Sequence, residues 1–132
     1  MTSLEWLAAS ALMTALFWIP YVLERMVALG IVGALKPVDP EHELQQALWA
    51  RRAKRAHYNA VENLVIIATL VLVAQPMGKG AASEVVFATE LYFWARLVHF
   101  PALTFGLPVV RTLAYLGGFA AQIIVAIQIF AS

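Results

Sequence analysis

Residues 51–75 read RRAKRAHYNAVENLVIIATLVLVAQ, a basic start that passes into a long apolar run. Within it, Arg52, Arg55, Asn59 and Glu62 are spaced three, four and three residues apart. An α-helix places residues at this spacing along one side. An ionised side chain at membrane depth is costly unless it has a partner, and such residues face a bundle interior or a wet cavity. The stretch therefore predicts a membrane helix with a polar site along one side, near one membrane surface.

The composition indicates a single membrane domain over residues 1–132. The chain is 62% hydrophobic and 13% charged, and its mean hydropathy is +0.78. A soluble domain of this size needs more polar surface. The net charge of +1 says nothing about nucleic acid, but no basic, aromatic-interleaved surface appears, so we predict no nucleic-acid partner. The chain has no cysteine, which excludes disulfides, thiolate metal sites and a cysteine nucleophile.

The apolar pattern predicts an all-α integral membrane protein built as a four-helix bundle. We expect spans at about residues 4–35, 42–75, 84–104 and 109–131. Pro20 predicts a bend in the first span. Asp39 and Pro40 resemble a helix N-cap and first helical residue, so the second helix is expected to begin near residue 40.

The distribution of basic residues predicts the orientation. Most of them flank the first connection and the start of the last span: Lys36, Arg51, Arg52, Lys54, Arg55 and Arg111. The second connection has only Lys79. The positive-inside rule then places both termini on the non-cytoplasmic side of a multi-pass protein. Polar residues of the second, third and fourth spans are thereby expected to meet near the cytoplasmic face.

Two interpretations of these polar residues stay open. Arg55 and Glu62 can pair with each other or with Arg96 and bind helices together, a contribution of about 1 kcal/mol or less per pair. Asn59 between them, with Arg96 and His99 on the third span, favours a functional site instead.

Two further polar residues, Arg111 and His57, lie outside the stripe on the second helix. Arg111 is either an interfacial anchor or the partner of an anion such as a thiolate or carboxylate. His57 lies on another side of its helix and is expected to face away, for instance toward another subunit. No spacing suits metal ligands, so we predict no metal.

The stretch RAHYNAVEN, residues 55–63, resembles the second-helix motif of the MAPEG family, the membrane-associated proteins of eicosanoid and glutathione metabolism, in its bacterial type. That motif is Arg-Ala-(His or Gln)-x-Asn-x-x-Glu, matched from Arg55 through Asn59 to Glu62. The family's third helix carries an arginine followed three residues later by histidine or tyrosine, as Arg96 and His99 do here. An arginine begins its fourth helix, as Arg111 does.

The resemblance implies a homotrimer in the membrane that binds glutathione, as cosubstrate, between subunits near the cytoplasmic surface. The residues implied to hold glutathione are Arg55, Asn59, Glu62, Arg96 and His99. Arg111 matches the arginine thought to stabilise the glutathione thiolate, and is the implied catalytic residue. The expected activity is that of a transferase or peroxidase acting on small apolar electrophiles or lipid hydroperoxides that enter from membrane lipids.

The chain also departs from the family pattern. Leu103 stands where relatives often have a tyrosine, and Asn63 where the leukotriene-forming branch has one. The prostaglandin-forming branch has arginine in place of Tyr58 and serine in place of Thr112. Eicosanoid synthesis is therefore not supported. One alternative is a non-catalytic module of the same fold that binds a lipid, another thiol or a partner protein. The other is a proton or ion path through Glu62, Arg96 and His99.

Overall fold

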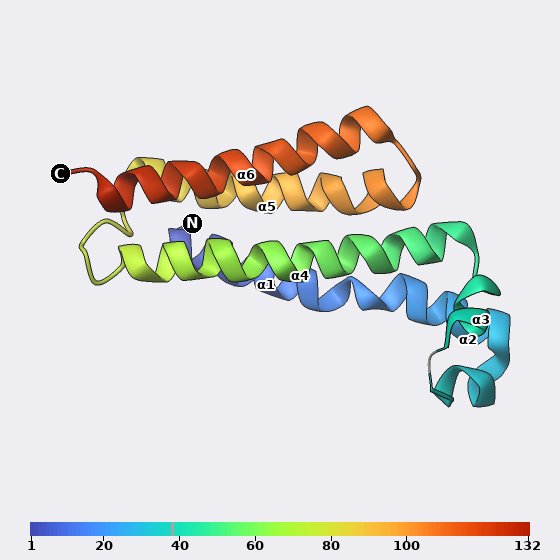
Figure 1. Ribbon diagram of the computed structural model, residues 1–132. Helices are drawn as coiled ribbons and strands as arrows, with labels where there is room; N and C mark the ends of the chain where they lie inside the picture. The colour runs from blue at the N-terminus through green and yellow to red at the C-terminus, as the bar shows by residue number, and fades with distance from the viewer. Residues whose placement is uncertain (38) are drawn as a thin grey trace.

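The computed structural model describes residues 1–37 and 39–132, without the side chain of His42. In these residues the secondary structure is helical and no strand occurs. The long helices run roughly along one direction (Figure 1). The all-α class predicted from the sequence is therefore confirmed.

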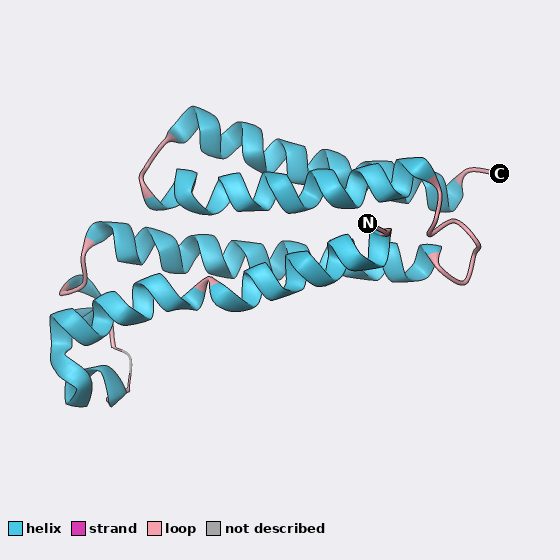
Figure 2. Cartoon of the chain, turned by 180° about the vertical axis from the view of Figure 1, so that it is seen from behind, coloured by secondary structure: helices cyan, strands magenta, loops and turns pink. Residues whose placement is uncertain are grey.

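The bundle is built from four long helical segments that pack against one another. α5 (Ser83–Thr104) packs most extensively on α6 (Pro108–Phe130), and α4 (Leu48–Ala74) contacts both of them as well as α1 (Ser3–Leu16). The chain termini lie toward the end where α4 passes into α5, and the α5–α6 turn lies at the opposite end (Figures 1 and 2). Residues 96–111 are thereby brought beside the start of α4.

The first predicted span is interrupted at two places. α1 ends at Leu16 and α2 (Trp18–Leu35) begins one residue later. Pro20 has no N–H to donate to the carbonyl of Leu16, which accounts for an interruption here. Gly30 has φ 72° and ψ 166°, so it interrupts α2 as well. The bend predicted at Pro20 falls within one turn of the first interruption, whereas nothing predicted the second.

The second predicted helix does not run continuously from residue 40. A short helix, α3 (Pro40–Leu44), begins at Pro40 as expected, but α4 begins only at Leu48. Between them, the Ala47 N–H donates to Glu24 Oε1 at 3.0 Å. Glu24 therefore accepts a hydrogen bond from a backbone N–H at the start of α4, where the helix itself has no acceptor for it.

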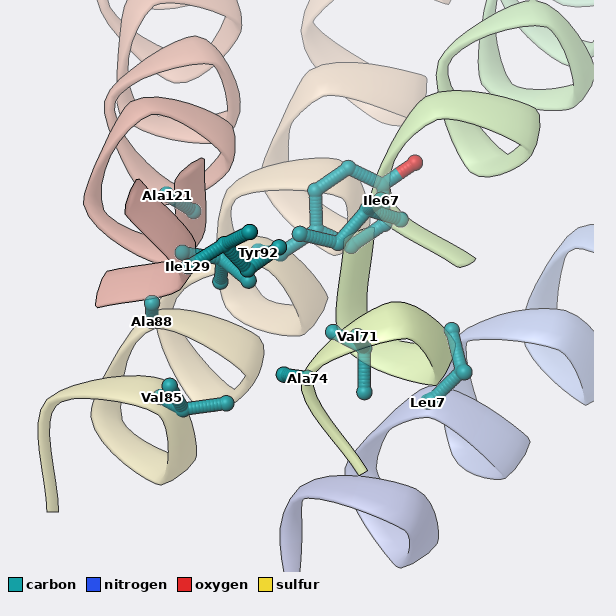
Figure 3. Close-up of a cluster of buried hydrophobic side chains, with 10 residues drawn as sticks. Leu7, Ile67, Val71, Ala74, Val85, Ala88, Tyr92, Ala121 and Ile129 are labelled. Carbon is teal, nitrogen blue, oxygen red and sulfur yellow. The ribbon is translucent and has the colours of Figure 1, made fainter. Parts of the chain in front are cut away.

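The main cluster of buried hydrophobic side chains lies in the half of the bundle nearer the termini. Its members come from four helices and include Leu7, Ile67, Val85, Tyr92 and Ile129 (Figure 3). In the other half, α4 buries only alanines, at positions 50, 53, 56 and 60. Small residues let helices approach closely in a membrane. The large aliphatic side chains that pack the helices together therefore lie in the half nearer the termini, away from the polar residues.

Three helical segments of the described chain are long and apolar enough to cross a membrane: Ser3–Leu35, Leu48–Ala74 and Pro108–Phe130. α5 has 22 residues but is less apolar, because it carries Glu90, Arg96 and His99. The structure thus shows the helix expected at residues 84–104. Its crossing of the membrane, and with it the count of four spans, stays a prediction.

Lys79 connects the α4–α5 turn to the end of α6. Its Nζ donates to the carbonyls of Gln128, Ile129 and Ala131 at 2.7, 3.2 and 2.6 Å. The last carbonyls of a helix lack partners within it and carry partial negative charge. We expect Lys79→Met to lower the stability of the protein by about 1–2 kcal/mol, and the melting temperature in detergent by several degrees.

The matched control for this change is Lys36→Met, at an exposed lysine in the other half of the protein. Hydrogen exchange should also accelerate in the last turn of α6 in the Lys79 variant and stay unchanged in the control. Equal melting temperatures for the two variants would show that the Lys79 contacts contribute nothing.

Candidate functional site

A groove of about 940 Å³ lies at the polar end of the bundle. Residues from α3, α4, the end of α5 and the start of α6 line it. Its charged side chains are five cations and two carboxylates: Arg51, Arg52, Lys54, Arg55, Arg111, Glu43 and Glu62. This excess of cationic groups suits an anionic ligand that also carries an amino group.

The stripe predicted on the second helix is present. Arg52, Arg55, Asn59 and Glu62 all line the same groove. They lie on the side of α4 away from its buried alanines, because the two sets are offset around the helix. The helical spacing read from residues 51–75 thus places the four side chains as predicted.

Arg96 lies behind the groove and is not among its lining residues. The residue is only 2% exposed, and its Nη2 donates to Asn59 Oδ1 at 2.6 Å. The Arg96 Nε is buried without a partner among the described residues. Arg96 therefore joins α5 to the lining side of α4 and fixes the carboxamide of Asn59.

His99 reaches the same region through a second cavity of about 320 Å³. Arg55, Asn59 and Arg111 line this cavity as well as the first. The His99 residue is 4% exposed, and its Nδ1 has no partner in the described part of the chain. The two cavities share three polar residues and form one site with a buried, unpartnered imidazole nitrogen.

Arg111 is exposed in the first turn of α6, which begins at Pro108. The amino end of a helix carries partial positive charge, so a cation there does not stabilise the helix. Its position is better explained by an external anion, which both the guanidinium and the helix end attract.

Glu62 is exposed near the middle of α4. Among the described residues its carboxylate has no ion pair and no hydrogen bond. The helix-binding pairs considered for Glu62 with Arg55 or Arg96 are therefore absent, and Arg96 is bonded to Asn59 instead. A free carboxylate at this depth needs a cationic partner from outside the chain or a covering surface.

His57 lines neither cavity and so faces away from the stripe as predicted, whereas a contact with another subunit stays a prediction. Its Nδ1 lies 2.7 Å from the Tyr21 hydroxyl and its ring stands edge-on to Phe17, so it contacts its own chain. Glu24 and Arg25, to which the sequence assigns no role, also contact their own chain. Glu24 accepts from Ala47 N, and Arg25 donates to two carbonyls at the end of α2.

Several residues that bear on the site were not predicted to do so. Gln122 Nε2 donates to Asn63 Oδ1 at 3.2 Å, and Asn63 Nδ2 donates to the Asn59 carbonyl at 2.9 Å. α3 supplies a wall of the groove through Pro40, Glu43 and Leu44. Spacing within one helix contains no information on such contacts between helices.

Gly106 has a similar hidden role in the α5–α6 turn. It has φ 70°, and a Cβ there would lie 2.6 Å from Arg52 Nη1. Only glycine suits both the turn and the approach of this guanidinium. The described residues contain no group of three or more His, Cys, Asp or Glu that could hold a metal ion.

A sequence model of the MAPEG family matches residues 3–131 of the chain. The protein therefore belongs to the MAPEG family, and together with its apolar helices this makes it a multi-pass integral membrane protein. A search of curated proteins and a search of solved structures each found no match.

The Arg96–Asn59 bond can be tested by removing its acceptor. Asn59→Leu leaves a buried guanidinium group without this partner, which costs about 2–3 kcal/mol. We expect a clearly lower melting temperature in detergent. Glu62→Gln is the matched control on the same side of α4, and it should not lower stability, because the carboxylate has no hydrogen bond or ion pair among the described residues. An Asn59→Leu variant as stable as Glu62→Gln would contradict this assignment.

Proposed function

We propose that this protein is a glutathione-dependent membrane transferase or peroxidase that works as a homotrimer. Arg55, Asn59, Glu62, Arg96 and His99 hold or support glutathione. Arg111 stabilises its thiolate. The acceptor is an apolar electrophile or lipid hydroperoxide that reaches the site from the membrane. The site lies toward the cytoplasmic face, with both termini on the other side.

The observation that carries this proposal is the set of unpaired charges in one groove. Glutathione has two carboxylates, one ammonium group and one ionisable thiol. The groove offers several guanidinium groups for the carboxylates and the free Glu62 carboxylate for the ammonium group. Arginine binds carboxylates through paired, charge-assisted hydrogen bonds. The buried Arg51 Nε, which has no acceptor in the described chain, adds a further donor beside the groove.

The position of Glu62 supports assembly as well as binding. A single chain leaves this carboxylate exposed about halfway along a helix that is long enough to cross the membrane. On insertion scales an ionised carboxylate in contact with lipid costs about 2.5–3.5 kcal/mol at the centre of a membrane helix, and less nearer the surface. A neighbouring subunit that closes the groove, with the ligand ammonium group inside, removes this cost.

The strength of one guanidinium is sufficient for thiol activation. A thiol of pKa about 8.5 needs about 2.7 kcal/mol to lower its pKa by two units. Two opposite charges about 4 Å apart at an effective dielectric of 20 attract each other by about 4 kcal/mol. Arg111 at contact distance from the sulfur therefore makes the thiolate the main form at neutral pH.

The chemistry then follows from the thiolate. In the transferase reaction, its sulfur forms a bond to an electrophilic carbon as the leaving group departs with the bonding electrons. In the peroxidase reaction, the sulfur attacks the outer oxygen of a hydroperoxide and the O–O bond breaks. The products are an alcohol and a glutathione sulfenic acid, which a second glutathione converts to disulfide and water. The membrane concentrates both kinds of apolar acceptor.

One observation favours the second candidate, a non-catalytic binding module. Leu103 lines both cavities, where relatives often have a tyrosine. The side chain offers no hydroxyl to a bound thiol or acceptor. Such a module would use the same groove to bind an anionic ligand without activating a thiol.

The two candidates differ in what Arg111 does to bound glutathione. Calorimetric titration of the detergent-solubilised protein is expected to show glutathione binding at or below millimolar concentration. Arg111→Ala should abolish the ultraviolet absorbance of the bound thiolate at neutral pH and lower turnover at least tenfold, since Arg111 favours the anion. Absence of glutathione binding at millimolar concentration would remove the proposal.

The control ligand is S-methylglutathione, which has the same charged groups but no ionisable thiol. Arg111→Ala should weaken its binding much less than it lowers thiolate formation, whereas Glu62→Gln should weaken both ligands equally. Sedimentation of each variant tests the trimer. Arg111→Ala that disrupts assembly but keeps thiolate formation would assign Arg111 a structural role.

A further inference from the structure

The outer part of α2 leaves the bundle at its polar end. Residues 26–35, here named the α2 extension, read MVALGIVGAL and contain no charged side chain. Figures 1 and 2 show this part of α2 and α3 bent away from the direction of the long helices. Its large aliphatic side chains are highly exposed: Val27 87%, Ile31 67%, Val32 74% and Leu35 79%.

The α2 extension is too far along the chain to belong to the first span itself. The apolar segment Ser3–Leu35 has 33 residues. At 1.5 Å per residue a helix of that length is about 50 Å long, whereas the hydrocarbon core is about 30 Å thick and needs about 20 residues. Glu24 and Arg25 follow the first 20 or so residues and mark the end of the span.

The chain's own contacts fix the reversal that follows. The Arg25 residue is 9% exposed, and its guanidinium donates to the carbonyls of Ala34 at 3.2 Å and Lys36 at 3.1 Å. Gly30, with φ 72°, permits the change of direction, and nothing lies within 4 Å of a Cβ built there. The Arg25 guanidinium thus has backbone acceptors inside this fold-back, and the aliphatic side chains are left outside.

Exposure of these side chains to water is unfavourable. Full burial of one Val, Leu or Ile side chain gains about 1.5–3 kcal/mol. The membrane surface is the nearest apolar medium, since the first span ends just before the extension. The exposed aliphatic side chains Leu16, Ile19 and Leu23 precede it on the same helical segment. The exposed Lys36 follows it, and a lysine there can reach the headgroups.

We propose that the α2 extension is an interfacial membrane anchor, which lies in the boundary between lipid headgroups and acyl chains. Its partner is the lipid surface. This places α3, which begins four residues after Lys36, beside the membrane surface. α3 lines the groove through Pro40, Glu43 and Leu44 and is tied to α4 by the Lys54–Glu43 ion pair at 3.6 Å. The anchor thereby sets where the outer wall of the groove stands, whatever ligand the groove binds.

The sequence contains no cysteine, so a single introduced cysteine can be labelled specifically. A nitroxide label is attached to single cysteines at Val27, Ile31 or Val32 in the full chain, in nanodiscs of phosphatidylcholine and phosphatidylglycerol. Collisions with oxygen, which concentrates in lipid, are compared with collisions with a water-soluble nickel chelate. Gln45→Cys, at an exposed residue outside the helices, is the reference for water, and Leu12→Cys, exposed on α1, is the reference for the hydrocarbon core.

For an interfacial anchor, the oxygen-to-nickel collision ratio of the three labels is several-fold above that of Gln45 and below that of Leu12. A ratio equal to that of Gln45 would place the extension in water and overturn the proposal. Low collision with both reagents, with spin–spin broadening that disappears on dilution with unlabelled protein, would show that a second copy covers it, which also overturns the proposal. Circular dichroism and size-exclusion chromatography confirm that each labelled chain is folded.

Discussion

The buried guanidinium of Arg96 is the constraint on which the polar half of this protein depends. A guanidinium is always charged, so it must have an acceptor wherever the bundle buries it. The acceptor is Asn59 Oδ1, on the helix that also presents Arg55 and Glu62 to the groove. This hydrogen bond thus joins the buried Arg96 of α5 to the side of α4 that lines the groove.

The rest of the bundle makes that arrangement possible because apolar packing and the charged groove lie at different places along the helices. Aliphatic side chains pack between the helices near the termini, and the helices are joined there by contacts such as Lys79 to the end of α6. The other half has alanines on the packing side of α4 and charges on its open side. Because apolar packing holds the helices together, the groove can keep charged groups that have no partner among the residues the structure describes. Such groups are a cost to stability and are typical of a binding site.

Membership of the MAPEG family and the unpaired charges independently support the proposal that the groove binds glutathione. The family associates the chain with glutathione metabolism in membranes. The groove has the charge pattern that a peptide with two carboxylates and one ammonium group requires. In our proposal the α2 extension lies at the membrane surface, and it leads into α3, which forms one wall of the groove.

Residue spacing and hydropathy were sufficient for the all-helical class and for the stripe on α4, but not for the interruption at Gly30 or the break between α3 and α4. Arg52, Arg55, Asn59 and Glu62 share one side because a helix repeats every 3.6 residues, a property of the local backbone. The partners of polar side chains on α4 depend on tertiary structure, since they come from other helices. Arg96 donates to Asn59 and not to Glu62. Gln122 donates to Asn63, and His57 is hydrogen-bonded to Tyr21. The fold-back after Arg25 likewise depends on carbonyls nine and eleven residues further along the chain. The sequence by itself determined which side chains face one way, because that follows from helical geometry. Only the tertiary structure decided which of them are buried, bonded or left free, because that depends on how the helices pack.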